Sequence, residues 1–310
     1  MTSQNLKVLK LLALEIKNVS KKYGEVSALQ DINFDIKAGE FVGLLGVNGA
    51  GKTTLISAIA GINRFEGQIR VMGYDVIRDV VKAKSNVGIV PQEIAYDPFL
   101  TVYQTLKLQA GLYGVHDKEW LSEVIERMHL RDKVNAPTRG LSGGMKRRLM
   151  VAQALVHKPP LIILDEPTAG VDVEIRKNLW SFITELHQLG HTILLTTHYL
   201  EEVEKLCNKI IMIDRGKIVA QSSTTSFMAQ ASRLATTVQI ETQDAKFSTA
   251  LNPLIITTEQ NMFTLKLGDS DELLPILTTL KNDGIKVESI NINRPSLEDV
   301  FINCLHPESI

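Results

Sequence analysis

The sequence has 310 residues, of which 5% are aromatic, and this length allows one large domain core together with a smaller second domain. Lys and Arg number 34 and Asp and Glu number 35, so the formal net charge is -1 and gives no long-range attraction to nucleic acid or to an acidic membrane surface. Cys207 and Cys304 lie far apart with no Cys-x-x-Cys spacing, which argues against a zinc site or a disulfide framework. No apolar run approaches the roughly 20 residues that a membrane helix needs, so we expect a chain of the reducing cytosol that does not cross a membrane by itself.

The first 140 residues predict strands, a buried helix and an inserted helical segment. Strand patterns with intervening turns occupy residues 12–45, and the apolar strand Phe41–Leu45 leads through a glycine-rich loop into the buried helix Thr53–Ala60. Glycines then separate several short strands. The character changes at about residues 93–140, where two segments have helical spacing and charged outer faces. These segments are Thr101–Leu112 and Lys118–Leu130.

Helices and strands alternate in the next part of the chain, which predicts a largely parallel sheet covered by helices. The elements expected there are a helix that includes Met145–Val156, the strand Leu161–Leu164, the helix Val173–Leu189, the strand Thr192–Thr196, the helix Leu200–Cys207 and the hairpin Ile210–Ala220. With the first half of the chain, this alternation predicts an α/β domain over residues 12–222, with the helical subdomain at about 93–140.

A change of composition after about residue 225 predicts a second, small α+β domain over residues 225–310. The elements expected in it are the strands Thr237–Thr242 and Met262–Leu267, the helix Asp271–Asn282, the strand Ile285–Asn293 and the short helix Ser296–Cys304. This region carries no cluster of residues typical of catalysis. We therefore expect it to stabilise the chain, with regulation of the first domain or dimerisation as the alternatives.

The glycine-rich loop, Gly46–Thr53, has the P-loop spacing of glycine, four residues, glycine, lysine and then serine or threonine. Glycines permit backbone conformations that turn several N–H groups into one concavity, and the helix that begins near Lys52 adds the positive end of its dipole. Lys52 is expected to reach the β- and γ-phosphates of ATP, and the Thr53 hydroxyl to bind Mg²⁺. Chance produces this spacing in roughly 1% of chains of this length. The residues expected to bind the nucleotide here are Gly46, Asn48, Gly49, Ala50, Gly51, Lys52, Thr53 and Thr54.

Two carboxylates, Asp165 and Glu166, end the apolar strand Leu161–Leu164. Ligands of parallel sheets bind at the carboxyl ends of the strands, so both side chains are expected beside the phosphates. Asp165 can hold Mg²⁺ directly or through water, and Glu166 can act as the general base that polarises an attacking water. Without a P-loop in the same chain, a solvated turn after a core strand would explain the pair better.

A second helix start with anion-binding character lies at Ser142, Gly143 and Gly144. Ser142 is a typical N-cap, and the two glycines leave the backbone bare at the start of the helix. With the P-loop upstream and the two carboxylates downstream, this segment resembles the signature motif of ABC ATPases. In that family two nucleotide-binding domains pack head to tail, and the signature of one closes over the ATP of the other. The resemblance therefore implies a homodimer with two equivalent sites.

Other residues of the ABC ATPase pattern follow in the family's order. Tyr23 resembles the aromatic residue that stacks on adenine, and Asp172 closes a segment similar to the D-loop. Gln92 resembles the Q-loop glutamine, which senses the γ-phosphate and Mg²⁺ and faces the transmembrane partner, and His198 matches the switch histidine. The resemblance covers about residues 12–222 and implies a P-loop NTPase fold of ABC ATPase type, with an antiparallel β subdomain and a helical subdomain. The catalytic residues that it implies are Glu166, His198, Gln92 and Lys52.

The segment Leu141–Arg148 and the tail Ser296–Phe301 are similar to ATP-binding subunits of the ABC-2 exporter type. This resemblance implies export by separate transmembrane permease subunits and a peripheral location on the cytoplasmic face of the inner membrane. Two positions depart from the common pattern. Val47 replaces a proline in the P-loop, where the backbone does most of the binding, and Met145 replaces a glutamine at the end of the signature, which affects the contact with the second copy.

Two other functions are compatible with parts of the pattern. One is a soluble ABC ATPase that acts on nucleic acid or ribosomes; it is disfavoured because the chain has one ATPase unit, no basic arm, and only 113 positions between Lys52 and Asp165. The other is a module that holds ATP without hydrolysing it. Such a module could dispense with Glu166 or His198, and this chain has both. We therefore expect no nucleic-acid partner.

Overall fold

The computed structural model describes residues 11–93, 96–168, 173–231, 236–243, 247–267, 270–293 and 297–305. The chain divides into two compact units, and the boundary falls between Ser222 and Ser223. Each unit has its own sheet and its own apolar core. The motifs predicted to bind a nucleotide lie in the larger unit, which contains a parallel sheet, an antiparallel sheet and a helical subdomain.

A six-stranded sheet in the order β10-β9-β3-β8-β7-β6 forms the centre of the larger unit. Its strands are β3 (Phe41–Leu45), β6 (Val87–Val90), β7 (Leu161–Asp165), β8 (Thr192–Thr197), β9 (Lys209–Asp214) and β10 (Lys217–Ser223). The ladders of β3 with β8 and β9, and of β7 with β6 and β8, are parallel. Every residue of β3 and β7 is buried, which explains why both strands are apolar runs. The prediction of a parallel sheet is confirmed.

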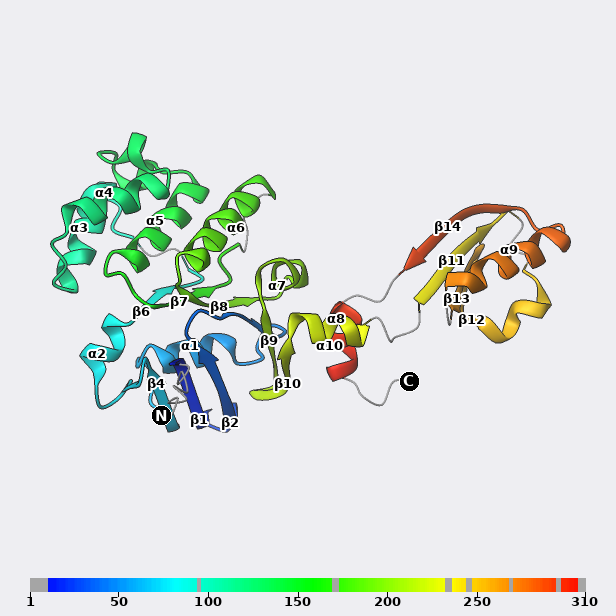
Figure 1. Ribbon diagram of the computed structural model, residues 1–310, viewed down its shortest axis with the longest axis horizontal. Coiled ribbons are helices and arrows are strands. Elements are labelled where there is room, and N and C mark those ends of the chain that lie inside the picture. The colour runs from blue at the N-terminus through cyan, green and yellow to red at the C-terminus, as the bar shows by residue number, and fades with distance from the viewer. Residues whose placement is uncertain are drawn as a thin grey trace, which may run out of the picture. The chain divides into compact units, whose positions relative to one another are not determined.

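Helices cover this sheet, and a smaller antiparallel sheet packs with one of them. The helices are α1 (Lys52–Ile59), α2 (Val80–Ser85), α6 (Val173–Gln188) and α7 (Leu200–Leu206), and Figure 1 shows α1 and α6 on opposite sides of the sheet. The antiparallel sheet has the order β2-β1-β4-β5, with β1 (Leu12–Tyr23), β2 (Val26–Lys37), β4 (Glu66–Val71) and β5 (Tyr74–Asp75). Leu55 and Ile59 of α1 share one apolar core with Ile36 of β2 and Ile163 of β7. The helix after the P-loop therefore packs with both sheets.

The helical subdomain consists mainly of α3 (Val102–Leu112), α4 (Lys118–Arg127) and α5 (Gly143–Leu155). Side-chain caps fix where the first two helices begin. Thr101 and Gln104 form a capping box at the start of α3, and the carboxylate of Asp117 accepts the N–H of the third residue of α4. Helix α4 ends at Arg127, earlier than expected, because the chain turns at His129 with a φ of 51°.

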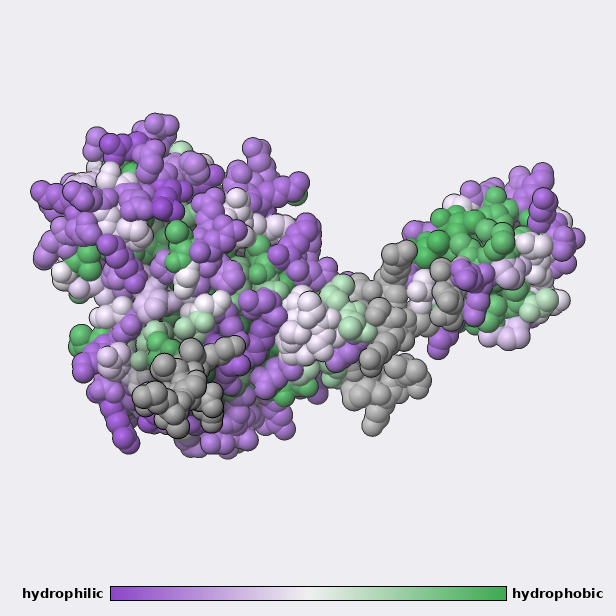
Figure 2. Space-filling model, viewed as in Figure 1, coloured by the Kyte–Doolittle hydropathy of each residue, from purple (hydrophilic) through white to green (hydrophobic). Residues whose placement is uncertain are grey.

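The smaller unit contains a four-stranded antiparallel sheet in the order β12-β13-β11-β14. Its elements are α8 (Thr224–Ala231), β11 (Thr236–Thr242), β12 (Ile255–Glu259), β13 (Met262–Leu267), α9 (Leu273–Asn282), β14 (Val287–Asn293) and α10 (Leu297–Leu305). Ile276 and Leu280 of α9 form the core with Val238, Ile240 and Leu265 of the sheet. Apolar surface remains over β11 and β14 (Figure 2). This is an α+β unit, as the sequence predicts, although β12 and α8 were not foreseen.

Candidate nucleotide-binding site

A cavity of about 960 Å³ opens at the carboxyl end of β3. This volume is at the upper end of the range typical of small-molecule sites. Polar groups from the P-loop, from the loops after β6 and β7 and from the end of β8 meet there. The lining residues foreseen from the sequence are Asn48, Gly49, Ala50, Gly51, Lys52, Thr53, Thr54, Gln92, Glu166 and His198.

The P-loop connects β3 to α1 in a conformation that depends on glycine. Gly49 has a φ of 81° and Gly51, the N-cap of α1, a φ of 111°, both in the region that favours glycine. A Cβ atom at Gly51 would lie 2.7 Å from the carbonyl oxygen of Ala28 in β2, and one at Gly46 would lie 2.5 Å from the carbonyl oxygen of Ile213. The loop is therefore packed so closely that its main chain forms the wall of the cavity.

Lys52 is a buried cation in this loop. Its Nζ donates hydrogen bonds to the carbonyl oxygens of Gly46 at 2.7 Å and Val47 at 3.3 Å, and it lies 3.5 Å from Oε1 of Glu166. Only 6% of the residue is exposed. A buried ammonium group in a glycine-rich loop at the start of a helix fits the phosphates of a nucleotide.

Hard oxygen atoms gather beside the lysine. The Thr53 hydroxyl donates to Oδ2 of Asp165 at 3.3 Å, and the Thr196 hydroxyl donates to Oδ1 of Asp165 at 2.6 Å. Burial raises the pKa of Asp165, because water no longer solvates the charged form. Within the described residues, no three His, Cys, Asp or Glu side chains form a metal cluster. The oxygens of Thr53 and Asp165 fit Mg²⁺, which usually takes one or two protein ligands and completes its shell with phosphate and water.

Several polar side chains of the site lie within 3.5 Å of the Glu166 carboxylate. Its carboxylate accepts a hydrogen bond from Nε2 of Gln92 at 3.1 Å and lies 3.4 Å from Nδ1 of His198. Glu166 has a φ of 45°, unusual for a residue with a side chain, and its N–H is held by both the carbonyl oxygen and the hydroxyl of Thr196 at 3.1 Å. The structure thus brings Lys52, Gln92 and His198, three residues predicted as catalytic, to the carboxylate of the fourth, Glu166.

Other predicted residues lie elsewhere. Tyr23 does not line the cavity: its hydroxyl accepts a hydrogen bond from Asn63 at 2.8 Å, and Nζ of Lys21 lies 4.8 Å from the ring centre. Its contact with adenine stays a prediction. Asp172 lies outside the described residues.

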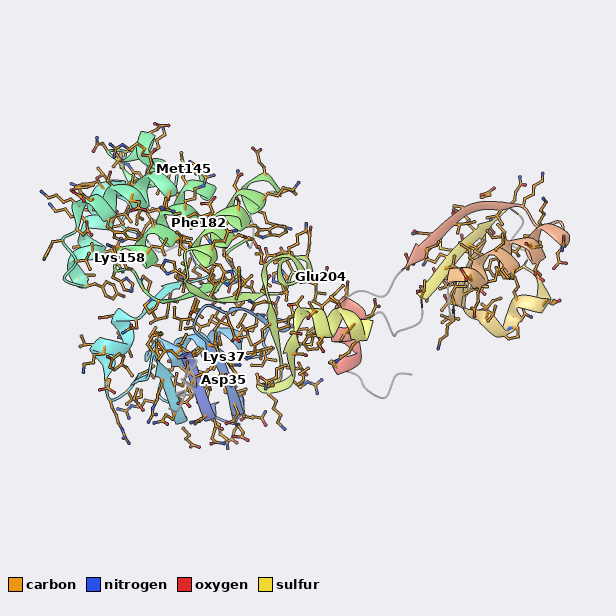
Figure 3. All side chains as sticks on the ribbon, viewed as in Figure 1. Asp35, Lys37, Met145, Lys158, Phe182 and Glu204 are labelled. Carbon is orange, nitrogen blue, oxygen red and sulfur yellow. The ribbon has the colours of Figure 1, made fainter. Side chains whose placement is uncertain are left out.

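The signature residues Ser142, Gly143 and Gly144 also do not line the cavity of their own chain. Ser142 caps α5, since its hydroxyl accepts the N–H of Met145 at 3.3 Å. Met145 lies in the first turn of α5, and Lys158 follows three residues after the end of this helix at Leu155 (Figure 3). Ser142 and Gly143 are exposed at the start of this helix.

One wall of the cavity was missed by sequence reasoning. It comes from β2 and from the turn between β9 and β10, where the Gln30 N–H donates to the carbonyl oxygen of Gly216 at 2.7 Å and the Gln30 side chain to that of Arg215 at 3.0 Å. These positions carry no motif, and only long-range pairing brings them to the P-loop. The lining residues not foreseen are Val26, Ser27, Ala28, Gln30, Tyr199, Arg215 and Gly216.

Comparison with known proteins finds a matching family model for each part of the chain. A family model described as ABC transporter matches residues 29–169, and one described as ATP-binding protein DrrA1-3-like, C-terminal domain, matches residues 231–304. The linearmycin resistance ATP-binding protein of Bacillus subtilis (strain 168) is 36% identical over 305 residues, covering 94% of this chain and 97% of the relative. The daunorubicin resistance ATP-binding protein of Streptomyces coeruleorubidus is 32% identical, covering 94% and 95%. A Nod factor export ATP-binding protein of Cupriavidus pinatubonensis (strain JMP 134 / LMG 1197) is 35% identical, covering 93% and 89%.

Comparison with solved structures also finds ATP-binding subunits of ABC transporters. An ATP-binding subunit of an ABC transporter has a TM-score of 0.65 at 30% identity and covers 70% of this chain and 92% of its own. A dimeric ATP-binding cassette in a post-hydrolysis state, bound to ADP and Pi, has a TM-score of 0.62 at 26% identity and covers 68% and 98%. Across the described part of the chain, no helix has the length and apolar character needed to span a membrane. The chain belongs to the ATP-binding subunits of ABC transporters and is a P-loop ATPase of that family.

Proposed function

We propose that this chain powers export through separate transmembrane permease subunits, and that it does so by ATP-driven dimerisation on the cytoplasmic face of the membrane. The catalytic part of the proposal is carried by the convergence of Lys52, Gln92 and His198 on the carboxylate of Glu166. The export part is supported by relatives that match nearly the whole chain and are named for linearmycin resistance, daunorubicin resistance and Nod factor export. These names do not favour the alternative of an ABC ATPase acting on nucleic acid or ribosomes.

The residues of the site have separate roles in hydrolysis. Glu166 orients and deprotonates the attacking water, and the contacts of Gln92 and His198 hold its carboxylate in place. Lys52 binds the β- and γ-phosphates through its buried ammonium group. Thr53, Asp165 and Gln92 would hold Mg²⁺, which would neutralise negative charge on the phosphates.

The dimer is supported by the location of the signature. Ser142 and Gly143 are exposed at the N-terminus of α5 and are not used by the cavity of their own chain, so they are available to the ATP of a second copy. A solved cassette of the same fold is dimeric. In this arrangement Tyr23 contacts adenine, and Asp172, from the segment similar to the D-loop, binds the nucleotide. The ATPase domain comprises residues 12–222, and residues 225–310 form an accessory domain.

Replacement of Glu166 by Gln tests the catalytic assignment. The amide cannot accept the proton of water, so we expect the ATPase rate to fall by about 10²- to 10⁴-fold while ATP binding persists. With ATP and Mg²⁺, Glu166→Gln should accumulate as a dimer in a size measurement. Glu204→Gln is the matched control, because Glu204 lies exposed on α7 and should keep the wild-type rate (Figure 3). Equal rates in Glu166→Gln and wild type contradict the assignment, and a persistent monomer contradicts the dimerisation mechanism.

The export proposal needs a membrane partner, which purification can test. A tagged Glu166→Gln chain, trapped with ATP in detergent-solubilised membranes, should recover a membrane-spanning protein that can then be identified. Recovery of ribosomal or nucleic-acid-bound material instead would support the alternative.

A further inference from the structure

Arg147 lies in α5, between the signature and the catalytic site, and only 4% of the residue is exposed. Its guanidinium group donates five hydrogen bonds, and all of them end on main-chain carbonyl oxygens. The acceptors are Pro91 at 2.8 Å and Gln92 at 3.1 Å for Nη1, Asp165 at 3.0 Å and Glu166 at 2.8 Å for Nη2, and Pro167 at 2.8 Å for Nε. Few side chains other than arginine can offer so many donors in one rigid plane.

These acceptors lie where two neighbouring strands end: Asp165 is the last residue of β7, and the other four belong to the loops that follow β6 and β7. Strands β6 and β7 are paired in parallel up to Val90 and Leu164, and beyond that pair the chain continues as the loops at Gln92 and Glu166. Arg147 connects the two main chains just past the end of the ladder. The side chains of Gln92 and Glu166 then meet at 3.1 Å in the cavity. The guanidinium group therefore fixes the two backbones that set this catalytic contact.

Burial of the charged Arg147 guanidinium group costs free energy, because the group loses its hydration. Burial lowers the pKa of Arg147, and the nearby charge of Asp165 only partly offsets this effect. The positive charge is stabilised by the five carbonyl dipoles, and an apolar side chain of similar volume would leave these acceptors without the donors that Arg147 supplies. The buried charge is therefore tied to the main-chain contacts that hold the two backbones in place.

We propose that Arg147 is a positioning residue for ATP hydrolysis, which holds Glu166 and Gln92 in register and connects them to the signature helix of the same chain. The inference rests on the catalytic roles proposed above for these two residues. Because Ser142 and Gly143 begin the helix that carries Arg147, movement of that helix on the ATP of the second copy is transmitted to the general base of its own site. The two ATP sites of the dimer are in this way coupled through the Arg147 guanidinium group of each chain.

The first test is Arg147→Gln, which removes the charge and leaves at most two donors. We expect kcat to fall at least about tenfold, because misplacement of a catalytic group has a large cost in rate. The affinity for ATP, measured in the Glu166→Gln background, should change by less than about threefold, since Arg147 does not line the cavity. Arg127→Gln is the control, because Arg127 makes its hydrogen bonds to Glu123 on the surface of α4 and should keep the wild-type kcat. Unchanged kcat with a lower unfolding temperature would show a merely structural role and overturn the proposal.

The second test is a double-mutant cycle with Gln92→Ala. If Arg147 acts through the placement of Gln92 and Glu166, the double variant should be at most about threefold slower than the slower single variant. Losses in kcat that multiply overturn the proposal. If Arg147→Gln does not fold, Arg147→Lys replaces it in the cycle, since it keeps the charge without the planar fork. If Glu166→Gln hydrolyses ATP at the wild-type rate, the proposed catalytic role of Glu166 is wrong. If Glu166→Gln is inactive but the kcat losses of the two single variants in the cycle multiply, only the proposed role of Arg147 is wrong.

Discussion

At the scale of single residues, Gly51 is the position where the P-loop main chain packs closely against β2, which lines the cavity. It combines a φ of 111° with a main chain so close to β2 that a Cβ atom would meet the Ala28 carbonyl oxygen at 2.7 Å. It is also the N-cap of α1, with no side chain to form a capping bond. Any side chain at this position must therefore move the loop, the helix start or β2, and all three border the nucleotide.

Gly51→Ala should lower the affinity for ATP by about 10- to 100-fold, since backbone strain of this kind costs roughly 1–3 kcal/mol and is relieved by moving the loop. Titration with ATP measures the change. Gly39→Ala is the matched control: Gly39 has a φ of 80° but open space around its Cβ position, and it is not part of the cavity. It should lose stability without losing ATP affinity. The same affinity in both variants and in wild type would show that the collision at Gly51 is unimportant for binding.

Part of the candidate site could be predicted because its motifs are local in the sequence, whereas Gln92 and His198 were placed by the resemblance to ABC ATPases. The P-loop spacing identifies Lys52 and Thr53, and the end of an apolar strand identifies Asp165 and Glu166. The contacts of Gln30 and Arg147 could not be predicted in the same way, because each joins main-chain groups from segments that are far apart in the chain. Hydrogen bonds to carbonyl oxygens leave no pattern of side chains to recognise.

At the scale of elements, His157 connects the end of α5 to β6 and α3. Its Nε2 lies 3.0 Å from the carbonyl oxygen of Val87 and must carry the proton, because a carbonyl only accepts. The centres of its ring and of the stacked Tyr113 ring are 3.8 Å apart, and its Nδ1 atom is buried with no hydrogen-bond partner among the residues that the structure describes. Protonation would place an N–H at Nδ1 with no acceptor. Burial accordingly lowers the pKa of His157 from 6.5.

This histidine should make the larger unit less stable in acid. The folded state binds its proton less well than the unfolded chain, so the stability is fully present above about pH 6.5 and is lost progressively as the pH falls toward the lowered pKa. We expect the unfolding temperature of wild type to fall more steeply between about pH 7.5 and 5.5 than that of His157→Gln, which cannot become charged. His116→Gln, at an exposed histidine, should behave as wild type. Equal slopes for wild type and His157→Gln contradict the prediction.

Elements with their own start signals could be predicted from the sequence. Helices α3 and α4 begin at capping side chains, Thr101 and Asp117, and both were foreseen. Strand β12 was not, because Ile256 to Glu259 are exposed on an edge strand and show no alternation of apolar and polar residues. Its pairing with β13 depends on the partner strand and not on its own pattern.

At the scale of the whole molecule, the chain combines two units whose cores are built separately. The core of the larger unit includes residues from both of its sheets and from α1, and that of the smaller unit includes Val238, Leu265 and Leu280. All residues found around the nucleotide cavity belong to the larger unit. Binding of ATP should therefore stabilise the folded state of the larger unit and not that of the smaller unit.

Calorimetry should consequently resolve two unfolding transitions, of which MgATP raises only one. A ligand at 100 times its Kd stabilises the unit that binds it by about 2.7 kcal/mol, and the smaller unit offers no cavity residue to gain from it. Leu265→Ala identifies the other transition, because removal of a fully buried leucine costs about 2–5 kcal/mol and should lower that transition alone. Leu274→Ala, at a position that is 72% exposed on α9, should leave both transitions in place. A single transition that moves with both MgATP and Leu265→Ala would show that the two cores unfold as one cooperative structure.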